Sequence, residues 1–224
     1  MNDAPVITID GPSGSGKGTI SRAVAKSLGW GLLDSGALYR LVALAARRAH
    51  VSLSDATALG RLAEPFDIRF GSTRSGEEAV WLDGEDVTQA IRTEGAGNDA
   101  SKVAALAPVR AALLERQRRF AVPPGLVADG RDMGTVVFPH AKVKIFLTAS
   151  PAERALRRYK QLKEKGVTAN LAALSLEIAE RDERDSTRSA SPLVASADAT
   201  MLDTTGMSVD DVIERVLRVA RALI

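Results

Sequence analysis

Residues 11–19 read Gly-Pro-Ser-Gly-Ser-Gly-Lys-Gly-Thr, and their types and spacing are suited to binding phosphate. An apolar run, residues 6–9, precedes them, and a helical pattern, residues 20–26, follows. Glycines let successive backbone N–H groups turn toward one anion, the helix points its positive dipole end at the same place, and Lys17 adds a point charge. The stretch predicts a P-loop that binds a nucleoside triphosphate, with Lys17 at an exposed loop–helix junction. A glycine-rich turn that only opens a helix is the alternative.

The residues after the lysine narrow this prediction. The general P-loop pattern has Ser or Thr directly after the lysine, whereas here Gly18 stands there and Thr19 comes next. Gly-Lys-Gly-Thr resembles the variant found in nucleoside monophosphate kinases, in which the nearby hydroxyl helps to hold Mg²⁺ and phosphates. The resemblance implies that Thr19 is a metal ligand.

A second polar stretch, residues 129–135, directly follows the apolar run of residues 126–128. In open α/β sheets, ligands bind at the carboxyl ends of the strands. Asp129 is placed like the acidic residue that holds Mg²⁺, directly or through water, in P-loop enzymes. Arg131 can neutralise phosphate, and Asp132 can accept a hydrogen bond from an exocyclic amine. A plain polar turn is the alternative.

Two further clusters of polar residues are candidates for the site, and each could also be ordinary local structure. Asp34 and Ser35 end an apolar run and can cap a helix whose opening turns hold Tyr39 and Arg40. The alternative to a site there is a capped helix with an exposed Tyr-Arg pair. The arginine-rich helical pattern of residues 153–160 resembles a kinase lid, and a basic helix in solvent is the alternative. The arginines of this pattern are Arg154, Arg157 and Arg158.

The helical pattern that ends in the arginine-rich residues 180–188 changes character along one face. Leu171, Leu174 and Ile178 form an apolar stripe, and the same steps of three and four residues lead to Arg181 and Asp185. A face that starts toward the core and ends charged indicates an internal polar site. The alternative is a solvated helix end held by pairs four residues apart.

Alternating strands and helices must position these residues. Apolar runs without polar alternation predict buried parallel strands joined by helices. Ser150 to Glu153 predict a helix start with a Ser cap and a Glu capping-box partner. Ser208 opens a last helix with an apolar stripe of Val212, Val216, Val219 and Leu223. The expected parallel strands are 6–9, 31–33, 126–128, 143–148 and 200–202, and an inserted antiparallel sheet is expected from residues 66–70, 79–82 and 85–87 around turns at 71–76 and 83–84.

Composition sets limits on the function. The 224 residues contain 30 Lys or Arg against 28 Asp or Glu, a net charge of +2, which does not favour binding to nucleic acid. Cysteine is absent, which excludes disulfides, thiolate metal sites and a cysteine nucleophile. No basic segment followed by an apolar signal region opens the chain, and no apolar run has the length of a membrane span. We expect a cytoplasmic monomer that binds neither nucleic acid nor membrane.

Six motifs, in this order along the chain, resemble the bacterial cytidylate kinase family. They are Gly-Pro-Ser-Gly-Ser-Gly-Lys-Gly-Thr, Leu-Asp-Ser-Gly-Ala-Leu-Tyr-Arg, Ile-Arg-Thr, Ala-Asp-Gly-Arg-Asp-Met-Gly-Thr-Val-Val-Phe-Pro, Lys-Ile-Phe-Leu and Glu-Arg-Asp-Glu-Arg-Asp. The resemblance implies an α/β fold: a P-loop kinase core with a five-stranded parallel sheet, an inserted subdomain that binds the nucleoside monophosphate and carries a small antiparallel sheet, and a short helical lid. Residues 1–224 then form one domain, with the core at 1–34, 103–150 and 186–224, the insertion at about 35–102, and the lid with its flanking helices at about 151–185.

The resemblance also implies the reaction and the residues that perform it. The family transfers the γ-phosphoryl group of ATP to CMP or dCMP with Mg²⁺. The implied ATP-binding residues are Gly11, Pro12, Ser13, Gly14, Ser15, Gly16, Lys17, Gly18 and Thr19. The implied catalytic residues are Lys17, Arg131, Arg157, Arg158 and Arg188, and the implied metal ligands are Thr19 and Asp129, partly through water. The implied acceptor residues are Ser35, Arg40, Arg131 and Arg188 for the phosphate, Ser101, Arg110 and Asp132 for the cytosine ring, Arg181 and Asp185 for the sugar, and Tyr39.

Other functions of a P-loop remain open at this point. A kinase of the same architecture that acts on UMP, dTMP or shikimate differs in the residues that contact the base. A GTP-binding switch usually carries Asn-Lys-x-Asp, which this sequence lacks. A DNA-binding ATPase fits poorly with a charge near neutrality.

Overall fold

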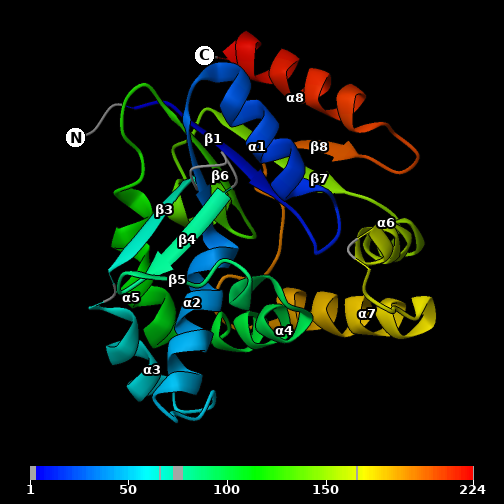
Figure 1. The fold of residues 1–224 in the computed structure, drawn as a ribbon. Coiled ribbons are helices and arrows are strands. Elements are labelled where there is room, and N and C mark those ends of the chain that lie inside the picture. The colour runs from blue at the N-terminus through cyan, green and yellow to red at the C-terminus, as the bar shows by residue number, and fades with distance from the viewer. Residues whose placement is uncertain (1–3, 66, 73–77, 165, 224) are drawn as a thin grey trace. The chain divides into compact units, whose positions relative to one another are not determined.

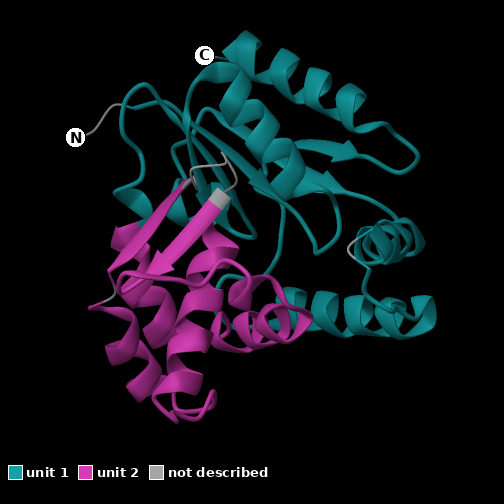
Figure 2. Cartoon of the chain, viewed as in Figure 1, with its two compact units in different colours: residues 1–34, 117–224 teal, residues 35–116 magenta. Residues whose placement is uncertain are grey.

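The computed structural model describes residues 4–65, 67–72, 78–164 and 166–223. The chain divides into two compact units, one formed by Met1–Asp34 with Gln117–Ile224 and the other by Ser35–Arg116 (Figure 2). The two units are described separately below. The division into core, insertion and lid, with its boundaries at residues 35, 102, 151 and 185, stays a prediction.

The first unit contains the expected parallel sheet, with the strand order β2-β6-β1-β7-β8 in the described residues (Figure 1). All neighbouring strands pair in parallel, as their apolar runs predict. Each strand ends on a polar residue or glycine, and Asp10, Asp34 and Asp129 lie at the carboxyl ends of neighbouring strands. The strands are β1 Val6–Asp10, β2 Gly31–Asp34, β6 Leu126–Gly130, β7 Val143–Thr148 and β8 Thr200–Asp203.

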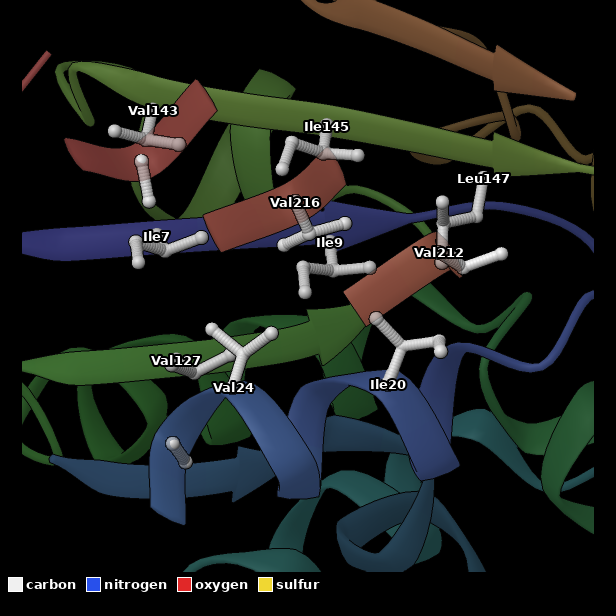
Figure 3. Packing of buried hydrophobic residues seen from close by; sticks show 12 residues of the cluster. Ile7, Ile9, Ile20, Val24, Val127, Val143, Ile145, Leu147, Val212 and Val216 are labelled. Atoms are coloured by element: carbon white, nitrogen blue, oxygen red, sulfur yellow. The ribbon is translucent and has the colours of Figure 1, made fainter. Parts of the chain in front are cut away.

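Apolar side chains of this sheet pack against α1 (Lys17–Leu28) and α8 (Val209–Leu223) (Figure 3). Ile9 of β1, Ile20 of α1 and Val216 of α8 are all part of this buried cluster. The predicted stripe on α8 is wrong at Leu223, which is 49% exposed, because the buried face consists of Val212, Val216 and Ala220. The cluster fixes α1, and therefore the loop before it, on the sheet.

Helices α6 (Pro151–Glu164) and α7 (Leu171–Thr187) pack against each other in the same unit. The Ser150 hydroxyl caps α6 by accepting from the amide of Glu153 at 3.2 Å. The second half of the predicted capping box is absent, since the amide of Ser150 donates to the hydroxyl of Thr205 at 2.9 Å. On α7, Leu174 and Ile178 are buried as predicted, but Leu171 in the first turn is exposed.

The second unit holds helices and the expected antiparallel sheet, with strand order β3-β4-β5. The buried face of α2, which includes Leu38, Leu41 and Val42, forms much of its core, and α2 packs on α4. Phe66 and the predicted turn residues 73–76 lie outside the described residues, and β3 runs through Gly71 and Ser72. The elements are α2 Ser35–Arg48, α3 Ala56–Ala63, β3 Ile68–Ser72, β4 Glu78–Leu82, β5 Glu85–Asp86, the 3₁₀ turn Ala90–Arg92, α4 Glu94–Val103 and α5 Ala107–Arg118, whose last two residues belong to the first unit.

In the part of the chain that the structure describes, every helix is too short or too polar to cross a bilayer.

Candidate functional site

The glycine-rich loop connects β1 to α1 in a conformation that other residues could not adopt. Gly11 has φ 148°, and a Cβ atom there would lie 2.0 Å from the carbonyl oxygen of Leu147 on β7. Gly16, directly before α1, has φ 92°, in the left-handed region that favours glycine. The helix begins at Lys17, so its free N-terminal amides face the loop. The strand, loop and helix that the sequence predicts are therefore present.

Lys17 lies inside this loop rather than at an exposed junction, which corrects the expectation. Its side chain is 6% exposed, and Nζ donates to the carbonyl oxygen of Pro12 at 2.9 Å. Burial, and then the positive charge of Arg131, lower the pKa of Lys17 to about 7. An ammonium group held among arginines favours a bound anion, because the anion would stabilise the charged form.

Asp129 places a carboxylate beside the first turn of α1. Its Oδ2 lies 3.4 Å from the position that a Cβ of Gly18 would occupy, and Thr19 is exposed in the same turn. Burial raises the pKa of Asp129 to about 6, against the opposing effect of Lys17. Carboxylate and hydroxyl oxygens are ligands that suit Mg²⁺, which usually takes only one or two protein carboxylates together with substrate phosphates. Among the described residues there is no group of three or more His, Cys, Asp or Glu side chains that could hold a metal ion.

Arg154 of α6 fastens the glycine-rich loop to α7. Its guanidinium donates to the carbonyl oxygens of Ser13 and Ala149, both at 3.0 Å. The same group donates to both carboxylate oxygens of Asp182, at 3.0 and 2.6 Å. Arg154 is buried, so these four bonds replace its contact with water.

The two lid arginines named as catalytic differ in their contacts. Arg157 donates to the carbonyl oxygens of Ser15, at 3.4 Å, and Thr204, at 2.6 Å, so it lies on the loop. The guanidinium of Arg158 donates to the side chain of Gln161 in its own helix. Arg157 therefore contacts the predicted phosphate loop, through the carbonyl oxygen of Ser15.

Asp185 gathers arginines beside the loop. Its Oδ2 accepts from Nε of Arg131 at 2.9 Å and lies 4.0 Å from Nε of Arg181. Arg181 also donates to the hydroxyl of Ser13 at 3.3 Å. Burial works against the charge on Arg131, but the neighbouring carboxylates, Asp185 first among them, together outweigh it, so the pKa of Arg131 is raised. Asp185 is buried, and the alternative of a solvated helix end is therefore wrong.

Asp132 and Arg188 form a second buried charge pair in this unit. Oδ1 of Asp132 lies 4.0 Å from a terminal nitrogen of Arg188, and both side chains are nearly inaccessible to water. Arg188 ends α7 as its C-cap residue, and Asp132 precedes the π-helical turn Met133–Val137. The structure thus joins the 129–135 loop to the end of α7, which sequence spacing alone did not link.

The remaining predicted site residues belong to the second unit. The guanidinium of Arg110 lies over the ring of Tyr39, 5.7 Å from its centre, and donates to the carbonyl oxygen of Ala104 at 3.1 Å. Arg40 donates to the carbonyl oxygen of Ile91 at 2.8 Å. Buried serines complete the set: Ser35 and Ser101.

Three residues that support the site were missed from the sequence. Asp182 was recognisable as part of the charged end of α7, but nothing in the sequence linked it to Arg154. Thr204, whose hydroxyl accepts from Arg157 at 3.0 Å, follows β8 without any distinguishing motif. Asp10 ends β1 and accepts from backbone amides of the 129–135 loop. Its position between an apolar run and the first glycine was the available signal.

Taken together, the glycine-rich loop, its buried lysine and the acidic strand end define a P-loop nucleotide-binding fold, and the surrounding arginines suit phosphoryl transfer. The family model described as cytidylate kinase matches residues 7–222. The cytidylate kinase of Stutzerimonas stutzeri (strain A1501) is 60% identical over 97% of this chain and 95% of its own length. That of Pectobacterium carotovorum subsp. carotovorum (strain PC1) is 57% identical over 99% and 98%. The chain therefore belongs to the cytidylate kinase family of phosphotransferases, as the motifs predict.

A solved structure supports the fold at low sequence similarity. The crystal structure of a gluconokinase from Sinorhizobium meliloti 1021 superposes with a TM-score of 0.51 at 16% identity, covering 100% of this chain and 95% of its own. At this identity the likeness shows the fold alone.

Proposed function

We propose that this kinase transfers the γ-phosphoryl group of ATP to CMP or dCMP with the help of Mg²⁺, as a monomer in the cytoplasm. The observation that carries the proposal is the positive charge gathered at the glycine-rich loop. Lys17 lies inside the loop, Arg157 and Arg181 donate to loop oxygens, and Arg131 is close enough to lower the pKa of Lys17. Such a cluster favours a polyanion over a neutral ligand.

The donor is proposed to bind along the loop. Amides of residues 11–19 surround the β- and γ-phosphates, and Lys17 exchanges its bond to the carbonyl oxygen of Pro12 for one to phosphate. Thr19 and Asp129 are the proposed ligands of Mg²⁺, which when bound neutralises charge on the phosphate oxygens. Of the lid arginines, Arg157 is better placed than Arg158 to cover the transferring group.

The acceptor nucleotide is proposed to use the two buried charge pairs of the first unit. Arg131 and Arg188 hold the acceptor phosphate and offset repulsion between two anions, and Arg181 and Asp185 contact the sugar. Asp132 accepts a hydrogen bond from the exocyclic amine of cytosine. Residues of the second unit carry the same proposal from the family resemblance: Ser35 and Arg40 for the phosphate, Ser101 and Arg110 for the ring, and Tyr39 as a further substrate-binding residue.

No protein nucleophile is required, since phosphoryl transfer depends mostly on positioning and on charge stabilisation. The arginines orient the acceptor oxygen in line with the γ-phosphorus and exclude water from it.

The test is ADP release with ATP and Mg²⁺ against CMP, dCMP, UMP, dTMP, AMP and GMP. We expect strong turnover with CMP and dCMP only. Turnover with another acceptor instead would contradict the assigned base contacts, and hydrolysis that needs no acceptor would contradict the kinase itself.

A further inference from the structure

Asp10 makes an unusual pair of contacts that the proposed reaction does not use. Its side chain is buried at the end of β1, directly before the glycine-rich loop. Oδ1 accepts from the amide of Met133 at 2.9 Å, and Oδ2 accepts from the amide of Gly134 at 2.8 Å. The partners are 123 and 124 residues away in the sequence.

Met133 and Gly134 open the π-helical turn Met133–Val137, and their amides have no partner within it. The side chain of the residue directly before a helix normally caps the second or third amide, here that of Gly134 or Thr135, and an aspartate at that position is well suited to the task. Here that residue is Asp132, yet its side chain makes no capping hydrogen bond. Asp10 caps the turn in its place, from another strand.

The consequence is that the Asp132 carboxylate is directed elsewhere. Its Oδ1 lies 4.0 Å from Arg188, in the region proposed to bind the acceptor. The two buried carboxylates also repel one another. Burial is the largest cause of the raised pKa of Asp10, and the negative charge of Asp132 raises it further.

Without Asp10, two buried amides would lose their acceptors. A buried amide without a partner is costly, and Asp132, the cap residue itself, carries a carboxylate suited to accept from the amide of Gly134. Turning onto the amide of Gly134 would take the Asp132 carboxylate away from Arg188. Removing one side chain on β1 would therefore change the orientation of a second one in the acceptor site.

We propose that Asp10 is a positioning residue for acceptor recognition: by capping the 133–137 turn it keeps the Asp132 carboxylate available for the exocyclic amine of cytosine. This inference rests on the role proposed above for Asp132. It links the strand that leads into the donor loop with the loop that selects the acceptor.

The experiment compares CMP with UMP, whose ring has a carbonyl oxygen where cytosine has the amine. The quantity measured is the ratio of kcat/KM for the two acceptors at saturating ATP, together with KM for ATP. The variants are Asp10→Ala, Asp10→Asn, Asp132→Ala and the double variant Asp10→Ala/Asp132→Ala. Thr8→Val is the matched control, because Thr8 is buried two residues earlier on the same face of β1 and its hydroxyl lacks a hydrogen-bond partner among the described residues.

We expect Asp10→Ala to lower the CMP/UMP ratio at least about tenfold, since lost hydrogen-bond recognition of a substrate commonly costs more than that. Asp10→Asn keeps one acceptor and should lower the ratio less. The double variant should match Asp132→Ala alone, and Thr8→Val should leave the ratio unchanged. A purely structural role would reduce kcat for both acceptors equally and leave the ratio as it was.

The outcomes distinguish the inference about Asp10 from the proposed contact of Asp132 with cytosine, on which it rests. If Asp132→Ala lowers the ratio and Asp10→Ala does not, the inference is wrong and the base contact stands. If Asp132→Ala leaves the ratio unchanged, the base contact itself is wrong. A raised KM for ATP with an unchanged ratio would place the role of Asp10 in the donor loop and overturn the inference. Should Asp10→Ala fail to fold, an unchanged ratio in Asp10→Asn would overturn it equally.

Discussion

Asp182→Ala removes the carboxylate that pairs with Arg154 and tests how firmly the phosphate loop is anchored. The guanidinium of Arg154 is 4% exposed, and both of its bonds to Asp182 would be lost. Breaking a fully buried ion pair costs about 3–5 kcal/mol, whereas an exposed pair contributes about 0–1 kcal/mol. The Asp182 side chain is 28% exposed, and Arg154 keeps its bonds to Ser13 and Ala149, so we expect an intermediate loss of about 2–3 kcal/mol.

The loss should appear in both stability and donor binding. Urea unfolding followed by circular dichroism measures the first, with the slope of the transition as a check that the compactness of the states is unchanged. Initial rates against ATP concentration measure the second. Because Arg154 is held against the loop at Ser13, we expect KM for ATP to rise several-fold while KM for CMP changes little.

Glu214→Ala provides the matched control. Glu214 forms an ion pair with Arg218, four residues later in α8, at 2.8 Å, but both side chains are more than 70% exposed. No measurable change in stability or KM is expected for it. If Asp182→Ala proves no more destabilising than Glu214→Ala, the reasoning from burial is refuted.

Three further predictions concern individual side chains. Lys17→Ala should abolish phosphoryl transfer. The unfolding free energy should fall little, because the substitution removes a charge whose burial is itself unfavourable. A fully active variant would exclude Lys17 from the donor site. Arg188→Ala should raise KM for CMP and lower kcat, with little change in KM for ATP. The control Arg218→Ala should change none of these constants. Unchanged kinetics in Arg188→Ala would contradict its assignment to the acceptor phosphate. Burial raises the pKa of Asp10 from 3.8 to about 7, so the stability contributed by its protonated form is present below pH 3.8 and lost as the pH rises to 7. Asp10→Asn cannot titrate, and its unfolding free energy relative to wild type should rise by about 3 kcal/mol between pH 4 and pH 7 in urea titrations; a constant difference would contradict the raised pKa.

The fold could be predicted from the sequence where a local pattern decided it. The apolar runs marked the parallel strands, and residues 11–19 marked the phosphate loop, because glycine spacing and a following helix are enough to define both. The predicted apolar stripes of two helices were wrong at one end each. Leu171 and Leu223 continue the correct period, yet they lie in the first and last turns, where the neighbouring core no longer covers them.

The contacts that organise the site could not be predicted, because they join residues far apart in the sequence. Nothing near Lys17 indicates that the loop encloses it, which depends on the packing of α1 on the sheet. Arg154 and Arg157 occur in one basic helix with Arg158, but only the folded arrangement shows which of the three meet the loop. The partner of Asp10 is likewise visible only when β1 and β6 lie side by side.

The most direct measurement follows the γ-phosphoryl group itself. ATP labelled at the γ-phosphorus is incubated with Mg²⁺, CMP and the protein, and the products are separated. The account predicts that the label appears in CDP in equal amount to the ADP formed. Label found only in inorganic phosphate, with CMP unchanged, would contradict it.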